Sequence, residues 1–170
     1  ADLEQHLTHE KVDVIFASFG FNESFKGQVG IKEFEEALTA FVERTRTKKF
    51  NGKTAPRIVL VSPIANENVD GVKAGDLNNA NIALYSKIVQ RVAAAKKVGF
   101  VDVFSATKAT MQSPGSDITF NGCHLTEEGD ALFAKTLFEG AFGGTAPIPS
   151  DAIRKAVTDK NRQYFRRFRP

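Results

Sequence analysis

The sequence predicts an α/β fold built on a parallel sheet with helices on both faces. Three runs rich in β-branched and aromatic residues have the length of strands, at 12–18, 57–62 and 98–104. Each run is followed, after a loop, by a longer segment whose apolar residues recur at helical spacing. Strands that alternate with helices pair in parallel, because each helix carries the chain back to the start of the next strand.

Local signals support each predicted element. The strand 12–18 is apolar almost throughout, which is typical of a parallel strand buried on both faces. Thr126 is a good N-cap residue, and Glu127 and Glu128 suit the positive end of a helix that begins there. We expect helices at 2–10, 31–49, 78–97 and 126–140 and a last helix that Ser150 caps, with loops at 20–30, 62–76 and 105–123.

Composition limits the classes of protein. The chain has 170 residues, 42% of them hydrophobic and 25% charged, which suits one soluble globular domain. Cys123 is the only cysteine and there are three histidines, so we expect no disulfide framework, no metal site and no cofactor. Because the chain begins at Ala1, it fits a processed product or a piece of a longer protein. The compartment stays open, with export to the periplasm as one candidate.

Two motifs at predicted strand and helix ends carry the candidate site. The strand 12–18 runs into the stretch 20–23, Gly-Phe-Asn-Glu. Much later, the stretch 118–129, Ile-Thr-Phe-Asn-Gly-Cys-His-Leu-Thr-Glu-Glu-Gly, leads into a predicted helix. His124 therefore lies just ahead of a rigid element, where an imidazole can be aimed. The loop after strand 57–62 holds further polar residues, at the end of a strand where α/β proteins place binding groups.

Together these motifs resemble the third and fifth sequence blocks of the SGNH (GDSL-type) hydrolases. The resemblance implies a flavodoxin-like, three-layer αβα fold with strand order 2-1-3-4-5, in which the three predicted strands are the last three. It implies that the domain is incomplete in this chain, with its first strands missing. An N-terminal segment or a second chain would complete the sheet, and strand 12–18 would then pair on both sides.

The resemblance also implies an esterase or acetylesterase that uses a Ser-His mechanism, with a small-molecule or carbohydrate ester as substrate. His124 would be the general base, and Asn22 and Gly20 would form the oxyanion hole, Gly20 by allowing a close turn. We expect Glu23 to hydrogen-bond within its loop. The Gly-Asp-Ser block that carries the family's nucleophile is absent, and Ser116 lies in the wrong context, so we expect the serine from outside this chain.

Asn121 departs from the family pattern, which has an aspartate three residues before the histidine. An amide oxygen can hold the imidazole tautomer, but it cannot offset the charge that forms on His124. Asn121 orients His124 in a dyad, or a nearby acid such as Asp117 substitutes, or the site is weak or inactive. The last interpretation leads to the alternative function, a catalytically inactive binding or structural module of a larger protein. No glycine-rich phosphate motif follows a strand, which disfavours a nucleotide-binding domain.

The end of the chain is set apart by a glycine- and proline-rich break. We expect residues 1–145 to form the SGNH-like domain and residues 146–170 a basic amphipathic helix, with seven basic and two acidic residues in 151–170. One basic helix on a near-neutral domain is too small a positively charged surface to indicate nucleic-acid binding. We therefore expect its Tyr and Phe side to dock onto this domain or the next, with no nucleic-acid and no membrane partner.

Overall fold

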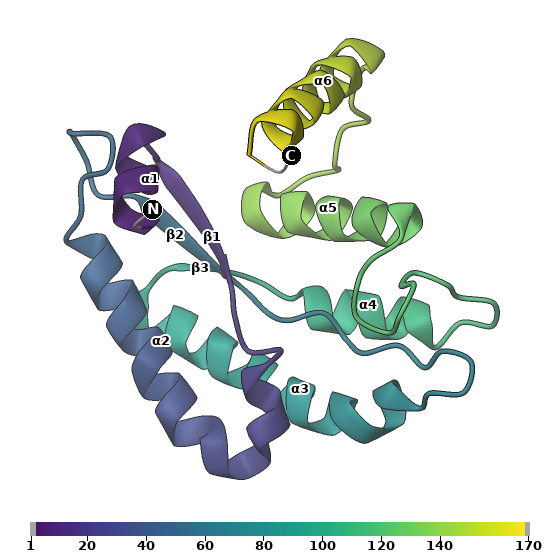
Figure 1. Ribbon diagram of the computed structural model, residues 1–170. Helices are drawn as coiled ribbons and strands as arrows, with labels where there is room; N and C mark the ends of the chain where they lie inside the picture. Colours follow the sequence, from purple (N-terminus) through teal and green to yellow (C-terminus); the bar gives the residue numbers. More distant parts are fainter. Residues whose placement is uncertain (1–2, 169–170) are drawn as a thin grey trace.

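The computed structural model describes residues 3–168 and contains one parallel three-stranded sheet (Figure 1). β1 (Val14–Ser18), β2 (Arg57–Val61) and β3 (Gly99–Val101) are hydrogen-bonded in the order β1-β2-β3. In the parallel register, Val14 pairs with Arg57 and Val59 pairs with Gly99. The predicted α/β class with a parallel sheet is confirmed.

Helices cover both faces of the sheet and make three layers (Figure 1). On β2, Ile58 and Leu60 pack against α2 and α3, whereas Val59 and Val61 pack against α5. This alternation explains why β2 is apolar along its whole length. The helices are α1 (Leu3–His9), the 3₁₀ helix η1 (Glu23–Gly30), α2 (Ile31–Arg46), α3 (Ala74–Lys96), α4 (Val103–Met111), α5 (Glu127–Phe142) and α6 (Asp151–Phe168).

β1 differs from its prediction, because only one of its faces is well covered. Ile15 and Ala17 join the core beneath α2 and α3. Phe16 points to the other face and is 40% exposed, since its ring meets only the edge of α5, with its centroid 6.3 Å from that of Phe142. Within residues 3–168, β2 is the only strand that pairs with β1. Pairing of strand 12–18 on both sides therefore stays a prediction.

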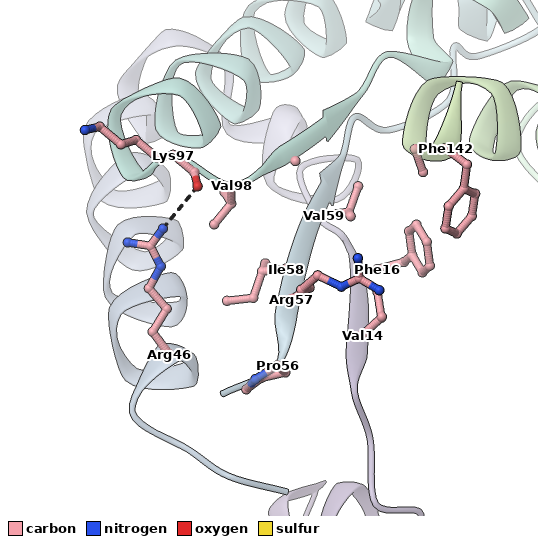
Figure 2. Close-up of a pocket in the computed structure, with 12 residues that line it drawn as sticks. Val14, Phe16, Arg46, Pro56, Arg57, Ile58, Val59, Lys97, Val98 and Phe142 are labelled. Atoms are coloured by element: carbon pink, nitrogen blue, oxygen red, sulfur yellow. Dashed lines mark hydrogen bonds between the residues drawn. The ribbon is translucent and has the colours of Figure 1, made fainter. Parts of the chain in front are cut away.

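The uncovered part of the sheet borders a cavity of about 400 Å³ at the amino ends of the strands (Figure 2). Val14, Phe16 and Arg57 line it, and the Arg46 guanidinium donates to the Lys97 carbonyl at its rim. Ligands of open α/β sheets bind at the carboxyl ends of the strands. This cavity is thus at the wrong end of the sheet for the candidate site.

α4 is a helix where the sequence analysis expected the end of strand 98–104 and a loop over 105–123. Asp102 is its N-cap and accepts a hydrogen bond from the Ser105 backbone N–H at 2.9 Å. The Ser62 hydroxyl accepts from the backbone N–H groups of the first two residues of α4, at 2.9 Å each. These contacts start α4 at Val103, so β3 ends at Val101, earlier than predicted. η1 likewise occupies part of the expected loop 20–30, and α3 begins four residues earlier than predicted.

α6 lies beyond α5, away from the sheet (Figure 1), and residues 151–167 are exposed. Its apolar residues are about half exposed, at 57% for Ile153, 47% for Val157, 57% for Tyr164 and 60% for Phe165. The docking of this side onto this domain or the next stays a prediction. No helix in the described range 3–168 has the length and apolar character to cross a membrane.

Candidate active site

His124 lies on a tight hairpin-like loop that precedes α5. Thr119 and Leu125 form an isolated antiparallel bridge, and the Phe120 N–H donates to the His124 carbonyl at 3.0 Å. Gly122, near the tip, has φ of 89°, a left-handed conformation that favours glycine. The loop therefore holds Asn121 and His124 on either side of its turn.

Asn121 contacts the imidazole directly. Its Oδ1 lies 3.0 Å from His124 Nδ1 and also accepts the backbone N–H of His124 at 3.0 Å. Because an amide oxygen can only accept, this contact requires the proton on Nδ1, and in the neutral imidazole Nε2 then carries the lone pair. The imidazole is exposed and stacks on Phe120, with ring centroids 5.6 Å apart and planes inclined by 19°. The contact that an orienting role of Asn121 would need is present, and the role itself stays a prediction.

Cys123 lies beside this pair. Its Sγ is 3.3 Å from His124 Nδ1 and 3.5 Å from Asn121 Oδ1, and the thiol is partly exposed. Within residues 3–168, no group of three or more His, Cys, Asp or Glu side chains could hold a metal ion.

The start of α5 fixes the loop from its other end. The Thr126 hydroxyl accepts the Gly129 N–H at 3.3 Å, as its predicted N-cap role requires. The Thr126 N–H donates to the Ile118 carbonyl at 2.9 Å. A Cβ at Gly129 would collide with that same carbonyl, so glycine lets the helix approach the loop closely.

A second loop, which follows β2, anchors the histidine loop. The Asn66 Nδ2 donates to the Gly122 carbonyl at 2.5 Å, and its Oδ1 accepts from Asn78 Nδ2 at 2.8 Å. The buried Glu67 carboxylate accepts hydrogen bonds from residues 116–119. The sequence marks this loop as a place for binding groups, but it indicates no role for these two residues. No local pattern marks them, because their partners lie about 50 residues away.

The Asn22 turn begins where β1 ends. Gly20 has φ of 111°, and a Cβ there would lie 3.2 Å from the Phe34 ring, so the turn requires glycine. The Gly20 N–H donates to Glu23 Oε2 at 3.0 Å, which confirms that Glu23 bonds within its loop. Asn22 is exposed at the start of η1, and its side chain makes no capping hydrogen bond. Its amide is therefore available to a ligand.

Tyr85 packs beneath the segment that follows this turn and bonds to it. The side chain is fully buried, and its hydroxyl donates to the Gly27 carbonyl at 2.9 Å. Burial raises the pKa of Tyr85, which keeps the phenol protonated as a donor. A Cβ at Gly30 would collide with the same hydroxyl, so a glycine there lets η1 pack onto α3.

The structure thus forms two pairs, Asn121 with His124 and Gly20 with Asn22. The second pair lines a small cavity of about 130 Å³ bounded by residues 18–23 and Pro63, and His124 is not among its lining residues. No hydrogen bond within residues 3–168 joins one pair to the other. A common pocket for Asn22 and His124 stays a prediction.

A parallel α/β sheet with these two loops defines the class of SGNH α/β hydrolases, and comparison with known proteins agrees. The model of the GDSL-like lipase/acylhydrolase family matches residues 1–132. The chain belongs to this family.

Solved structures share the fold at low sequence identity. Axe2, an acetylxylan esterase from Geobacillus stearothermophilus, is 16% identical with a TM-score of 0.61, over 82% of this chain and 64% of its own. An Axe2 mutant described as an acetyl-xylooligosaccharide esterase gives 17% and 0.64, over 86% and 66%. LAE5, an α/β hydrolase from the metagenome of Lake Arreo, Spain, gives 16% and 0.61, over 85% and 70%. The chain thus spans less than two thirds of the Axe2 length, and no curated protein sequence matches it.

Proposed function

We propose that this chain is part of a serine-type ester hydrolase in which His124 is the general base and the nucleophilic serine comes from a segment outside these 170 residues. The observation that carries the proposal is the 3.0 Å contact between Asn121 Oδ1 and His124 Nδ1. It selects the tautomer whose Nε2 can accept a proton. The family to which the chain belongs supports the same reaction class.

The reaction uses the residues as follows. The serine hydroxyl gives its proton to His124 Nε2 while its oxygen attacks the acyl carbon, and the carbonyl oxygen becomes an oxyanion. The Asn22 amide donates to that oxyanion; one such donor is worth ~3–4 kcal/mol in the transition state. The Gly20 N–H is already bonded to Glu23, so Gly20 contributes the turn. The imidazolium then protonates the leaving alcohol, and water repeats the steps on the acyl-enzyme.

The structural neighbours support these roles and a substrate class. The solved structures of Axe2 include catalytic mutants that replace a serine, an aspartate or a histidine by alanine, and the aspartate precedes the histidine by three residues. Asn121 and His124 have the same spacing. Because Axe2 is an acetylxylan esterase, we infer that an O-acylated carbohydrate is the substrate class here.

We further propose that an N-terminal segment or a second chain completes the sheet and brings the serine. The support is the edge of β1, which has no second strand beside it among residues 3–168, and the exposed ring of Phe16 on the sheet face that α5 leaves open. The chain together with that segment is called the assembled enzyme below. In it, residues 1–145 belong to the hydrolase domain, and the basic helix α6 belongs to a separate C-terminal region, residues 146–170.

The alternative is an inactive SGNH-like binding or structural module. Asn121 favours it, because this neutral amide leaves the imidazolium charge without a balancing carboxylate at the family's acid position. A fluorophosphonate probe separates the two functions. Labelling of a serine, located by mass spectrometry of the assembled enzyme, favours the hydrolase.

The test of the proposal is hydrolysis of p-nitrophenyl acetate by the assembled enzyme and its His124→Ala variant. Loss of the general base should lower kcat/KM at least ~10²-fold. His9→Ala is the matched control, because His9 is exposed on α1, outside both candidate loops. Equal rates for wild type and His124→Ala would end the catalytic assignment.

A further inference from the structure

We propose that Glu67 is a positioning residue whose buried carboxylate sets the conformation of the loop 116–124 and so the aim of His124. The inference rests on the proposed function, in which His124 is the base. Glu67 is 4% exposed and lies in the loop after β2, far in sequence from the histidine.

Within residues 3–168, all hydrogen bonds that this carboxylate accepts come from one short segment. Oε1 accepts from the Ser116 hydroxyl at 3.1 Å and from the Ile118 N–H at 3.4 Å. Oε2 accepts from the Thr119 N–H at 2.8 Å and from the Thr119 hydroxyl at 2.6 Å. A carboxylate offers about four acceptor positions, so this segment uses the whole capacity of the group.

Hydrogen bonds rather than a cation hold the buried carboxylate. None of the ion pairs among residues 3–168 involves Glu67. A buried carboxylate without a cation depends on correctly placed donors, and charge-assisted bonds are stronger than neutral ones. The conformation of residues 116–119 and the position of the Glu67 side chain therefore depend on each other.

Two sets of contacts connect Glu67 with the loop that carries His124. Thr119 pairs with Leu125 in the bridge that closes the loop, and its hydroxyl also accepts the Gly122 N–H at 3.0 Å. The Glu67 N–H donates to the Gly122 carbonyl at 2.9 Å. A Cβ at Gly122 would lie 3.0 Å from the Glu67 carbonyl oxygen, so the turn packs directly on this anchor. The base of the loop and its tip are thus fixed by the same residue.

Glu67→Gln in the assembled enzyme tests the role. The amide keeps the size of the side chain but turns one oxygen into an NH₂ group, which faces donors of Ser116 and Ile118 or of Thr119. We expect kcat for p-nitrophenyl acetate to fall roughly 10²-fold with little change in KM, the size of loss that follows a small misplacement of a catalytic group. Glu67→Asp, which keeps the charge, should recover part of that loss.

The second readout is the imidazole itself, observed by NMR of ¹³C-histidine-labelled protein. The ring resonances of His124 should shift or broaden in Glu67→Gln. Asp76→Asn is the control, because the exposed Asp76 bonds Asn68 of the loop after β2 and makes no hydrogen bond with residues 116–124. If Glu67→Gln does not fold, Ser116→Ala deletes only the 3.1 Å bond and should give a smaller shift in the same direction.

The outcomes are distinct. A lower melting temperature with unchanged kcat and unchanged His124 resonances would show that Glu67 only stabilises the fold, and would overturn the inference. If His124→Ala leaves activity unchanged, the proposed function fails, yet the His124 resonances still report whether Glu67 fixes the loop.

Discussion

At the scale of single residues, Asn121 gives His124 the hydrogen bond that a carboxylate would give, but not the negative charge. Its oxygen accepts the Nδ1 proton and fixes the ring, in the geometry that the structure shows. It carries no charge, so it cannot stabilise the imidazolium that forms when the serine loses its proton. Asn121 should therefore lower the rate of hydrolysis relative to a site with a carboxylate at this position.

Asn121→Asp should raise kcat of the assembled enzyme. The reverse change in a serine-protease triad costs ~10⁴ in turnover, so we expect a gain of at least ~10-fold here. A carboxylate also raises the pKa of the adjacent imidazole. Because the base must be neutral, the acidic limb of the rate profile should then move to higher pH. The measurement is kcat against pH.

Asn161→Asp on the exposed helix α6 is the control for charge alone and should leave the profile in place. An unchanged or lower kcat in Asn121→Asp would mean that the site does not work through a charged imidazole.

The residues that the sequence revealed are those with a local signature. Asn22 and His124 are marked by neighbouring glycines, a strand end or a helix start, and the contact between Asn121 and His124 follows from their spacing of three. Glu67 and Ser62 could not be found in this way. Their partners lie 49 to 52 and 41 to 42 residues away, and only the folded sheet brings them together.

At the scale of elements, the beginning of α5 links helix stability to the site. Thr126 caps the helix and also contacts the loop, since its hydroxyl donates to the Asp117 carbonyl at 3.2 Å. Thr126→Ala should lower the free energy of unfolding by about 1 kcal/mol, the usual cost of losing an N-cap. Thr126→Ser keeps the oxygen and should cost much less. Urea denaturation of the assembled enzyme measures both, and equal losses would contradict a capping role.

Elements with strong periodicity were predicted well. The buried positions of α2 and α3 follow the apolar spacing of the sequence, and all three strands lie where β-branched runs occur. α4 was missed because its first residues, Val103 and Phe104, continue an apolar run. The Ser62 hydroxyl caps their N–H groups from another strand's end, and this tertiary contact overrides the local β preference.

At the scale of the whole molecule, we expect the sheet to grow at β1. Phe16 is exposed, and within residues 3–168 one side of β1 has no strand beside it, so an added strand and helix would cover both features. The strand order β1-β2-β3 agrees with the expected last three strands of the domain. The sequence could not predict that the second face of β1 is only partly covered within this chain. That coverage depends on where α5 packs on the sheet.

Hydrogen exchange should detect the added strand. In the assembled enzyme, the β1 amides that do not bond to β2 should exchange slowly, because a second strand protects them. The chain alone should exchange the same amides quickly, while β2, paired on both sides, stays protected. Fast exchange on β1 in the assembled enzyme would mean that no strand pairs there.

The anchoring of the histidine loop from the loop after β2 also has a consequence for engineering. Residues 66 and 67 tie that second loop to the active site, whereas its tip at Val69 to Val72 only bonds to itself. Libraries that vary the tip should therefore keep many active clones. Libraries that vary residues 66 and 67 should instead consist mostly of inactive proteins, because the loop that carries His124 is no longer held in place.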